Sequence, residues 1–561
     1  MRYAAVRCHP AAAADWQARA VAAGLQPADP CGEFNLFTAA DTPVRVIYGW
    51  AIVGEWHGRA GGGGSKLSGP ESRHVPLTGW GRYVALRCDQ GSAEIFRDPS
   101  AGLPCYHVRR GTADLFVSGA DVAQRLGALD AAGIDEAFLV HWLQYPHLRS
   151  GRTGLTGVDE LAAGTARRWT GERWSDEPRW QPEAIAKRPL EGNLKIVAEQ
   201  LKAVVLDAVE RQLADRPLLL QLSGGLDSSI LAVSLAERKV PFEAVTFATR
   251  SADGDERHYA AAAAQRCGAA LHIVEETDGA ALPAVLPVSF RPGPNLLVSV
   301  LDEAIEQVRA QCDAWLVDGA GGDNLFGSSS TAAPAADGLL SGRPGAIGDV
   351  ARRSGSSWWK AMSYALSSLA GRYRTRKWPE DRSFLARGVL LPASDGHPWL
   401  RRVGRLPPGK QEHVGSLLHI QSFLDRHASG SRLLHPLLAQ PILELCLRTP
   451  SWLTVAGGTD RAVARQAFAG LLPPLVAARR SKGSLEGLLY RRFVQLQPRL
   501  RELLLDGELA RRGLLDRPAI EATSGSDSWH ATNSHVRLSE IATLELWFQG
   551  ALSALGRRSG G

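Results

Sequence analysis

The sequence predicts an α/β protein built from two domains, and three observations support this fold class. The chain has 561 residues, more than a single hydrophobic core usually holds. Short β-rich segments broken by Gly and Pro fill the first third, whereas strands and helices alternate after about residue 190. We therefore expect a β-sandwich domain over residues 1–183 and a parallel-sheet domain over residues 184–561.

In the first domain, β-branched and aromatic residues predict strands at 44–50, 83–88 and 93–96. Residues 166–183 are rich in Arg, Trp and Pro and show no apolar periodicity, so we expect them to connect the two domains. The glycine run at 61–65 is typical of a surface loop.

In the second domain, helical and strand patterns alternate, as in a parallel sheet covered on both faces. Strands are expected at 217–222, 242–247, 271–274 and 314–317, and helices at 228–238 and 258–267. Ligands of such sheets bind beyond the carboxyl ends of the strands. Chemistry is therefore expected in the turns after Leu222, Phe247 and Val317.

The turn after Leu222 reads Ser-Gly-Gly-Leu-Asp-Ser-Ser over residues 223–229 and opens a helix. Its glycines let the backbone turn tightly, and the N–H groups of the helix start suit a phosphate chain. Phosphates would repel the carboxylate of Asp227 unless a cation lies between them. The alternative is that Asp227 only caps the helix.

The turn after Val317 reads Asp-Gly-Ala-Gly-Gly-Asp-Asn-Leu-Phe-Gly over residues 318–327. Its glycines again permit close approach of a ligand, and Asp323 can supply a second carboxylate to a magnesium ion.

The 223–229 block resembles the signature of the ATP pyrophosphatase (PP-loop) superfamily, and the 318–327 block resembles that of the asparagine synthetase family. The resemblance implies that ATP is cleaved between its α- and β-phosphates with Mg²⁺ held by Asp227 and Asp323, which also serve catalysis. It implies a nucleotide site made of Leu222, Ser223, Gly224, Gly225, Asp227, Ser228, Ser229, Phe247, Asp318 and Gly319.

Residues 479–484, Arg-Arg-Ser-Lys-Gly-Ser, match the lysine loop of the same family, as do residues 457–473 before them. The resemblance implies that Lys482 contacts the α-phosphate and stabilises charge during catalysis. Asp255 and Glu256 match an acidic pair of that family, but negative charge at an exposed helix start explains them equally well.

The segments 81–85 and 97–106 look like the glutaminase half of asparagine synthetases, so the resemblance implies an Ntn-type, glutaminase-like first domain and a PP-loop synthetase second domain. A working glutaminase needs a cysteine nucleophile at its mature N-terminus. Here Arg2 occupies position 2, and Cys8 falls in an apparent first strand. We therefore expect the nucleophile to be an amine of the substrate.

The synthetase half departs from the family pattern at Ala320 and Asn324, where asparagine synthetases carry glutamate. The 318–327 block and residues 432–441 instead resemble the lasso peptide cyclase branch. That resemblance implies that an Asp or Glu side chain of a precursor peptide is adenylated and then attacked by the peptide's N-terminal amine. A leader peptidase and a leader-binding protein are the implied partners. His435 and His427 could transfer the proton, although packing inside a helix also explains each.

Other functions stay open. A β-lactam synthetase-like enzyme would share Asp227, Asp323 and Lys482 but act on a small molecule, as would a glutamine-independent enzyme resembling asparagine synthetase. A tRNA-modifying PP-loop enzyme would leave the matches at 97–102 and 479–484 unexplained. A non-enzymatic ATP-binding scaffold should have lost the two carboxylates.

The composition argues against several classes of protein. Seven scattered cysteines without a Cys-x-x-Cys pair argue against a disulfide framework and a zinc site. No secretory signal and no apolar run of about 20 residues is present, so we expect a cytoplasmic protein with no membrane partner. The net charge of +6 does not by itself indicate an anionic partner, and no nucleic acid is expected. Basic and Trp residues crowd between 352 and 410, which suits either a peptide or RNA surface or a solvated helical face.

Overall fold

The computed structural model describes residues 1–28, 31–58, 75–89, 91–251, 254–276, 282–284, 286–293, 295–371, 378–389, 396–424, 432–480, 483, 485–524 and 534–556. None of the helices within these ranges is long and apolar enough to cross a membrane.

Two antiparallel sheets stack face to face in the N-terminal third. The first has the strand order β10-β8-β9-β1-β3-β2, and the second has the order β12-β11-β7-β6-β5-β4. The bounds are β1 (Tyr3–Arg7), β2 (Gln26–Pro27), β3 (Phe34–Thr38), β4 (Val44–Ile47), β5 (Trp50–Gly58), β6 (Gly79–Asp89), β7 (Ser92–Arg97), β8 (Tyr106–Arg110), β9 (Ala113–Val117), β10 (Val158–Glu160), β11 (Thr165–Trp169) and β12 (Trp174–Pro178). Alternate residues such as Phe34, Val53, Val84 and Phe116 form the core between the sheets.

The structure corrects three expectations for this region. Residues 44–50 are not one strand but a hairpin, because Tyr48 and Gly49 adopt positive φ angles of 47° and 80° and turn the chain from β4 into β5. Residues 166–183 are not a connector: they form β11, β12 and the start of α4 (Pro182–Ala186), with Arg167 of β11 bound to Asp176 of β12. Cys8 lies just beyond β1 rather than inside it.

The second region contains a five-stranded sheet of order β15-β14-β13-β16-β17 with every pairing parallel. Its strands are β13 (Leu218–Gln221), β14 (Glu243–Ala248), β15 (Leu271–Glu275), β16 (Trp315–Val317) and β17 (Leu433–Leu434). Alternation of strand and helix in the sequence thus correctly predicted a parallel sheet. The predicted α/β class, antiparallel first and parallel second, is confirmed.

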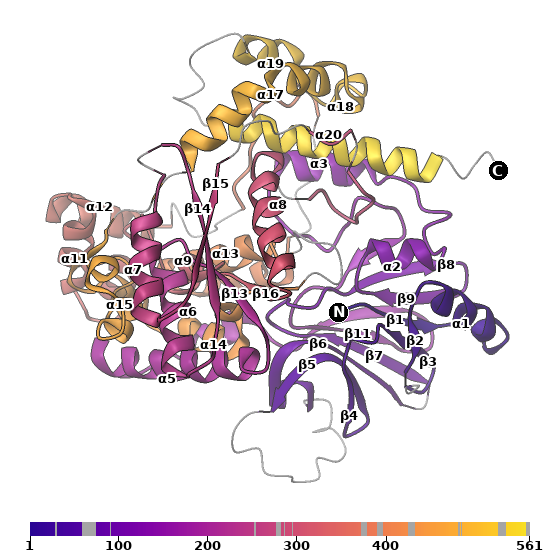
Figure 1. The fold of residues 1–561 in the computed structure, drawn as a ribbon, viewed down its shortest axis with the longest axis horizontal. Helices are drawn as coiled ribbons and strands as arrows, with labels where there is room; N and C mark the ends of the chain where they lie inside the picture. Colours follow the sequence, from indigo (N-terminus) through magenta and orange to yellow (C-terminus); the bar gives the residue numbers. More distant parts are fainter. Residues whose placement is uncertain are drawn as a thin grey trace.

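Helices cover both faces of the parallel sheet (Figure 1). Apolar residues of α5 (Leu194–Leu213), α6 (Leu226–Glu237) and α7 (Arg257–Cys267) join one core cluster with Leu218 and Leu220. Ile305 of α8 (Leu296–Gln311) packs with Leu219 and Val245 on the opposite face. Because side chains alternate along each strand, neighbouring residues of β13 face different layers.

The remaining helices surround these sheets. Their bounds are α1 (Ala13–Ala22), α2 (Ala120–Arg125), α3 (Glu136–Gln144), α9 (Gly322–Leu325), α10 (Ala333–Leu340), α11 (Gly345–Ser354), α12 (Trp358–Leu369), α13 (Pro408–Gln421), α14 (Gln440–Arg448), α15 (Ala462–Phe468), α16 (Pro474–Ala478), α17 (Glu486–Asp506), α18 (Glu508–Arg511), α19 (Arg517–Ser524) and α20 (Ser534–Gly556).

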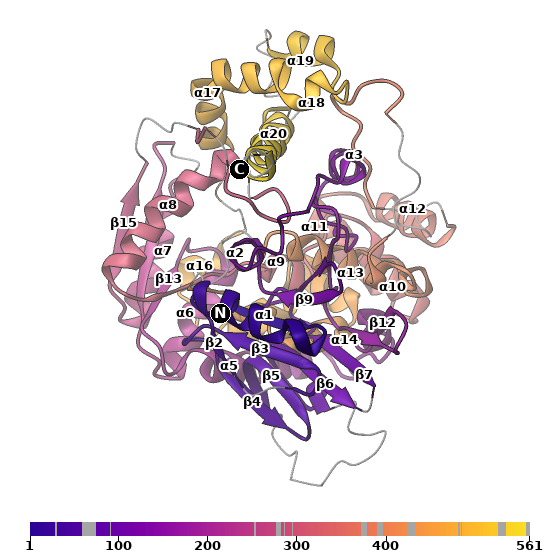
Figure 2. The same ribbon diagram turned by 90° about the vertical axis from the view of Figure 1, so that its right-hand side faces the viewer.

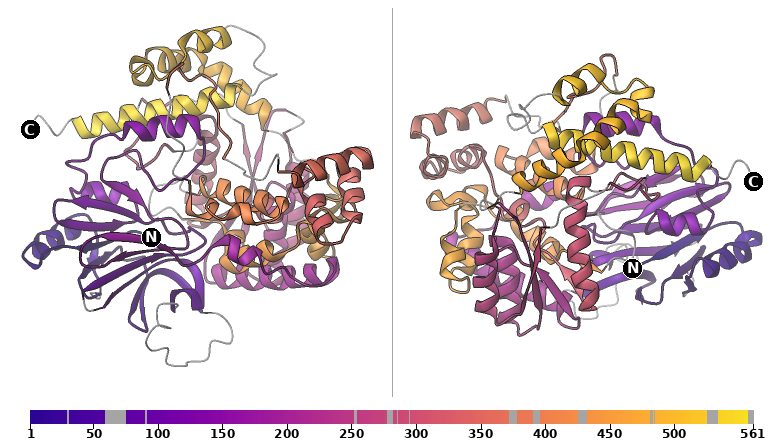
Figure 3. Two further views of the ribbon diagram at one scale, coloured as in Figure 1. Left: turned by 180° about the vertical axis from the view of Figure 1, so that it is seen from behind. Right: turned by 45° about the horizontal axis from the view of Figure 1, so that its top comes forward.

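The C-terminal helices form a layer that reaches back to the N-terminal region. In Figure 2, α17, α18, α19 and α20 lie together above the sheets, and both views of Figure 3 show α20 running across the sandwich side. Trp547 of α20 packs at a tilt of 54° against Phe138 of α3, and its indole N–H donates to the carbonyl of Ser289 at 2.9 Å. The C-terminal helices and the N-terminal region therefore share one apolar core. A domain boundary at residue 183 stays a prediction.

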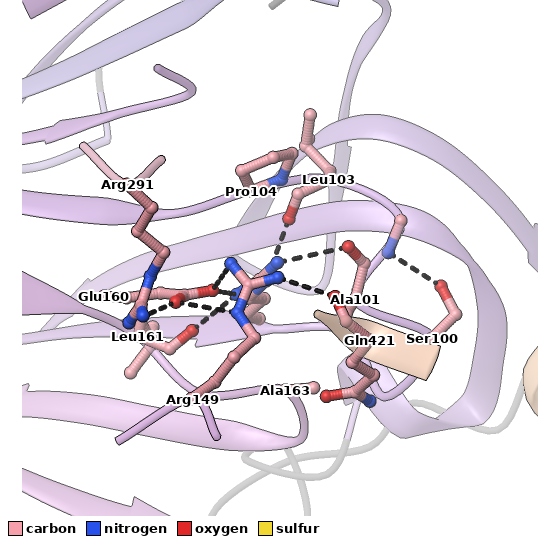
Figure 4. Close-up of polar contacts among 12 residues, drawn as sticks. Ser100, Ala101, Leu103, Pro104, Arg149, Glu160, Leu161, Ala163, Arg291 and Gln421 are labelled. Atoms are coloured by element: carbon pink, nitrogen blue, oxygen red, sulfur yellow. Dashed lines mark hydrogen bonds and ion pairs between the residues drawn. The ribbon is translucent and has the colours of Figure 1, made fainter. Parts of the chain in front are cut away.

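A buried ionic cluster also joins the two regions (Figure 4). The carboxylate of Glu160 receives Arg97 at 2.8 Å, Arg149 at 2.6 Å and Arg291 at 3.1 Å. Burial by itself would raise the pKa of Glu160, but the three guanidinium groups lower it well below the usual range. Arg149 also donates to the carbonyl of Gln421 at the end of α13, at 2.7 Å. These buried ion pairs and hydrogen bonds thus connect the sandwich to the parallel-sheet region.

Candidate active site

Residues 223–229, the predicted phosphate loop, follow the carboxyl end of β13, as the sequence predicts. Leu222 is buried and its N–H donates to the carbonyl of Val245 in β14, at 2.8 Å, which fixes the start of the loop. Gly224 has a φ of +69°, and an added Cβ there would overlap Tyr259 of α7. Only glycine fits such a site without strain.

The serines of this loop hold its shape. Ser223 Oγ accepts the N–H of Gly225 at 3.3 Å and lies 3.2 Å from Ser228 Oγ. Ser228 and Ser229 lie in the first turn of α6 and are buried. The N-cap residue of α6 is Gly225, and Asp227 is the second residue of the helix, so the alternative that Asp227 serves only as the N-cap is not supported. The helix therefore presents its N-terminal N–H groups at the edge of the sheet.

Asp227 and Asp323 converge on one point, which is the Nη1 atom of Arg461. This atom lies 3.0 Å and 3.1 Å from the two carboxylate oxygens of Asp227 and also contacts Asp323. Burial lowers the pKa of Arg461, but the facing carboxylates of Asp227, Asp323 and Asp460 outweigh burial and raise it. The two aspartates are thus close enough to share a single cation, as a divalent metal ion between them would require.

Two glycines of the second loop allow this approach. An added Cβ at Gly322 would overlap the carboxyl group of Asp227, and one at Gly319 would come within 2.8 Å of the Ser228 amide nitrogen. The loop after β16 therefore lies directly on the loop after β13. The pattern of glycines in residues 318–327 is the sequence signal of this contact.

Asp318 and His435 form a hydrogen-bonded pair at the same edge. Val317 of β16 pairs with Leu434 of β17, so the residues that follow them leave the sheet side by side. His435 Nδ1 lies 2.7 Å from Asp318 Oδ1, and that oxygen also accepts the N–H of Ala320 at 3.0 Å. Each side chain is less than 20% exposed, at 17% and 19%. The alternative that His435 is packed inside a helix is wrong, because it precedes the short 3₁₀ helix Pro436–Leu438.

The lysine loop is anchored beside the phosphate loop. Glu256 accepts the N–H of Gly483 at 2.9 Å and contacts the guanidinium of Arg479. Arg479 in turn donates to the carbonyl of Gly224 at 3.3 Å and stacks 4.0 Å above the Tyr259 ring. Lys482 itself lies outside the described residues, as does His427.

The acidic pair thus divides into two roles. Asp255 binds Arg257 within the same helix start, at 2.8 Å, which agrees with a simple charge at a helix terminus. Glu256 instead links the start of α7 to the loop that carries Lys482. Phe247 lies on β14 opposite Val274 and is half-buried near the end of the strand.

Neither position at which the chain departs from the asparagine synthetase pattern carries a base. Ala320 has only a methyl group, and Asn324 donates its side-chain amide to the hydroxyl and carbonyl oxygens of Ser416 in α13, at 2.7 Å and 3.0 Å. Asn324 therefore fixes α9 against α13.

The 97–102 motif of the N-terminal region has a structural role. Arg97 is fully buried in the Glu160 cluster, and Asp98 accepts the N–H of Ser100 at 2.8 Å and that of Tyr83 at 3.2 Å. Burial raises the pKa of Asp98 to about 6, against these hydrogen bonds. The backbone N–H of Arg2 donates to Thr42 Oγ1 at 2.9 Å, and Cys8 follows β1.

A cavity of about 530 Å³ lies between the sandwich and the parallel-sheet region. Met1, Trp80 and Leu103 line it on the sandwich side, whereas Phe290 and His435 line it on the other. Volumes of this order are typical of small-molecule sites. The cavity therefore extends from the chain start to the Asp318–His435 pair.

The basic and aromatic segment between 352 and 410 is only partly described. Trp359 of α12 is 76% exposed and its neighbour Trp358 is 40% exposed, whereas Lys410 is buried with its ammonium on the carbonyls of Cys446 and Thr449. Residues 372–377 lie outside the described residues. A role of this surface in binding stays a prediction.

Comparison with known proteins places these features in context. A model of the asparagine synthase family matches residues 200–549, which is more than half of the chain. Comparison with curated proteins found no match. Among solved structures, the allosteric regulatory enzyme of purine biosynthesis is similar at 10% identity and a TM-score of 0.23, covering 56% of this chain and 89% of that one. Glutamine phosphoribosylpyrophosphate amidotransferase from B. subtilis is similar at 10% identity and a TM-score of 0.21, covering 57% and 90%.

Proposed function

The chain belongs to the asparagine synthase family and is therefore an ATP-dependent, amide-forming ligase, and we propose that it closes the macrolactam ring of a lasso peptide. In this proposal the enzyme adenylates an Asp or Glu side chain of a precursor peptide. The N-terminal amine of the same peptide then displaces AMP and forms an isopeptide bond. A leader peptidase and a leader-binding protein would supply the substrate.

The observation that carries the adenylation step is the convergence of Asp227 and Asp323 beside the N-terminus of α6. Backbone N–H groups of Ser223 to Ser229 would bind the phosphates of ATP. The two aspartates would hold Mg²⁺, which would neutralise the pyrophosphate as it leaves. Arg461, which contacts both carboxylates, would turn its guanidinium to the phosphates.

Lys482 would stabilise the charge on the α-phosphate during both half-reactions. The contacts of the flanking residues support this role. Glu256 binds Gly483 and Arg479, and Arg479 binds the carbonyl of Gly224 in the predicted phosphate loop. Phe247, Asp318 and Gly319 would complete the nucleotide site from the ends of β14 and β16.

The choice of a peptide substrate rests on the 318–327 and 432–441 blocks. Asp318 and His435, one from each block, lie against each other, and His435 borders the cavity between the two regions. Closing a ring requires that amine and adenylate be held together, and proximity of this kind supplies much of the rate. A cavity of about 530 Å³ would take the ring-closing end of a peptide, not a whole folded product.

The test is to mix the protein with Mg-ATP, a candidate precursor peptide and its leader peptidase, and to measure AMP, pyrophosphate and peptide mass. We expect one AMP for each peptide that loses one water. Asp227→Asn should lower both signals roughly 100-fold or more. Asp207→Asn, at a side chain that is 60% exposed on α5, should change neither.

Two outcomes would contradict the proposal. If the peptide stays unchanged while a small amino diacid is cyclised, the enzyme resembles a β-lactam synthetase in its substrate. If aspartate and ammonia give asparagine, it is a glutamine-independent asparagine-forming enzyme.

A further inference from the structure

The amide-forming step needs a group that takes a proton from the attacking amine. An ammonium has no lone pair, so it must lose one proton before it can attack, and the attacking amine must lose a second proton as the amide forms. The two positions at which asparagine synthetases carry glutamate, Ala320 and Asn324, offer no carboxylate here. The proton acceptor must therefore lie elsewhere on the site.

We infer that His435 is this acceptor and that Asp318 is the residue that positions it. The inference rests on the proposed function and adds to it the catalytic base and the direction from which the amine arrives. Three observations on the described residues carry it: the hydrogen bond between the two side chains, their place beside the phosphate loop, and the cavity onto which His435 opens.

The hydrogen bond to Asp318 fixes the tautomer of the His435 imidazole. Because a carboxylate oxygen only accepts, Nδ1 of His435 donates its proton to Asp318 Oδ1 at 2.7 Å. In this tautomer Nε2 is the nitrogen that can accept a proton. Asp318 is itself held, because Oδ1 also receives the N–H of Ala320 at 3.0 Å. The base is thus oriented before the substrate binds.

The pair lies next to the place where the acyl-adenylate would form. Gly319, the residue after Asp318, lies against the Ser228 amide of the phosphate loop. Leu438, three residues after His435, closes on Gly321 of the loop that carries Asp323. His435 therefore lies between the phosphate-binding loops and the cavity.

The cavity gives the amine its path. Its wall near His435 includes Leu438 and Ala439, and Trp80 and Leu103 lie on the facing side. Such a wall suits the apolar stem of a peptide end, with the amine directed to His435. We assign this cavity to the amine-bearing end of the substrate.

The amine nitrogen attacks the carbonyl carbon of the adenylate, its proton moves to Nε2 of His435, the C–N bond forms, and the bond from that carbon to the phosphate oxygen of AMP breaks. AMP leaves with that electron pair. The proton passes from His435 to solvent, and the neutral imidazole returns.

The test separates adenylation from ring closure in one preparation. ATP–pyrophosphate exchange reports adenylation, hydroxylamine trapping reports accumulated acyl-adenylate as a hydroxamate, and peptide mass reports ring closure. His435→Asn is the decisive variant, because its side-chain amide can still donate to Asp318 yet cannot act as a base. We expect exchange within about threefold of wild type, more hydroxamate, and ring closure slower by roughly 100- to 10,000-fold.

Further variants test the same assignment. Added imidazole should restore part of the ring closure of His435→Ala. Asp318→Asn should slow ring closure more than exchange, since its amide can donate to Nδ1 and place the ring proton on Nε2. His272→Gln, at a side chain that is 39% exposed on β15, should change nothing.

Ring closure at the wild-type rate in His435→Asn would overturn the inference and leave the proposed function intact. Equal loss of exchange and ring closure in that variant would also overturn it, because His435 would then only support the nucleotide site. Absence of peptide-dependent exchange in the wild type would instead remove the proposed function.

Discussion

Single side chains hold the loops of the proposed active site in position. The guanidinium of Arg461 binds the carboxylates of both Asp227 and Asp323. The carboxylate of Glu256 binds the guanidinium of Arg479 and accepts the Gly483 N–H. The sequence suggested the aspartates and left Glu256 undecided. It assigned no role to Arg461, because a guanidinium in an Arg-rich chain carries no signal until its partners are known.

Glu256→Gln tests the anchor of the lysine loop. Loss of the carboxylate removes charge-assisted bonds to Arg479 and Gly483, which typically contribute about 1.5–3 kcal/mol. We expect kcat for AMP formation to fall about 10- to 100-fold while the fold stays intact by circular dichroism. Asp255→Asn is the matched control, because the Asp255 carboxylate binds the neighbouring Arg257, whereas the Glu256 carboxylate binds the lysine loop. Equal effects of the two substitutions would argue against the anchor.

At the level of elements, the site is the contact between two strand-to-helix loops. Gly319 and Gly322 let the loop after β16 approach the loop after β13. Leu434 and Val317 place His435 next to Asp318 through a strand pairing of only two residues. So short a strand has no periodicity of its own, and for that reason the sequence did not predict β17.

Gly322→Ala should disable the site without unfolding the protein. The added methyl group would overlap the Asp227 carboxyl group and push the loops apart. A displacement of about 1 Å in such a site can cost roughly 100-fold in rate, and we expect a loss of that size in ATP–pyrophosphate exchange. At Gly470 an added Cβ meets nothing within 4 Å, so Gly470→Ala should keep full exchange. Similar activity of both variants would refute the close contact.

The helix α20 should be essential to stability. Trp547 is 1% exposed, packs on Phe138 of α3 and binds the Ser289 carbonyl. Trp547→Ala should lower the free energy of unfolding by about 3–5 kcal/mol in urea denaturation. Trp359→Ala, at a side chain that is 76% exposed, should change it by less than about 0.5 kcal/mol. A small loss at Trp547 would mean that α20 is only loosely docked.

For the whole molecule, the interface between the sandwich and the parallel-sheet region is polar as well as apolar. Besides the Glu160 cluster, Glu55 of β5 binds Arg82 at 2.9 Å and also Arg216, which precedes β13. Arg82 donates to the carbonyl of Leu433 in β17 at 3.3 Å. Glu55 thus connects the second antiparallel sheet to the parallel sheet that carries the site.

Glu55 should make stability depend on pH. Burial raises its pKa, but Arg82 and Arg216 outweigh burial and lower it to about 2 from an ordinary 4.5. Since the folded-state pKa is depressed, the contribution is complete above about pH 4.5 and is lost as the pH falls towards 2. Glu55→Gln should cost at most about 3 kcal/mol in urea denaturation at pH 7.

That difference from wild type should shrink when the same denaturation is measured near pH 3. Glu502→Gln, which removes an exposed ion pair with Arg499, should cost less than about 1 kcal/mol at either pH. A pH-independent loss in Glu55→Gln would show that the side chain acts through packing alone.

The sequence by itself determined the fold class, the family and the two carboxylate loops. Each of these depends on local signals: alternation of apolar segments, glycine at turns, and residue types that must follow a strand directly. The β13, β14, β15 and β16 strands all lie within two residues of where apolar runs placed them. The prediction of a connector at residues 166–183 was wrong because β11 and β12 pair through polar and aromatic residues, Arg167 with Asp176 and Trp169 with Trp174. These residues do not show the apolar alternation by which strands are predicted.

Tertiary structure alone decided which side chains meet. Arg461 lies 234 residues from Asp227, and His435 lies 117 residues from Asp318. The cavity between the two regions likewise has walls from segments distant in the chain. The physical reason is that a hydrogen bond or ion pair requires atoms within about 3 Å, and only the packing of the sheets and their loops brings such distant residues that close.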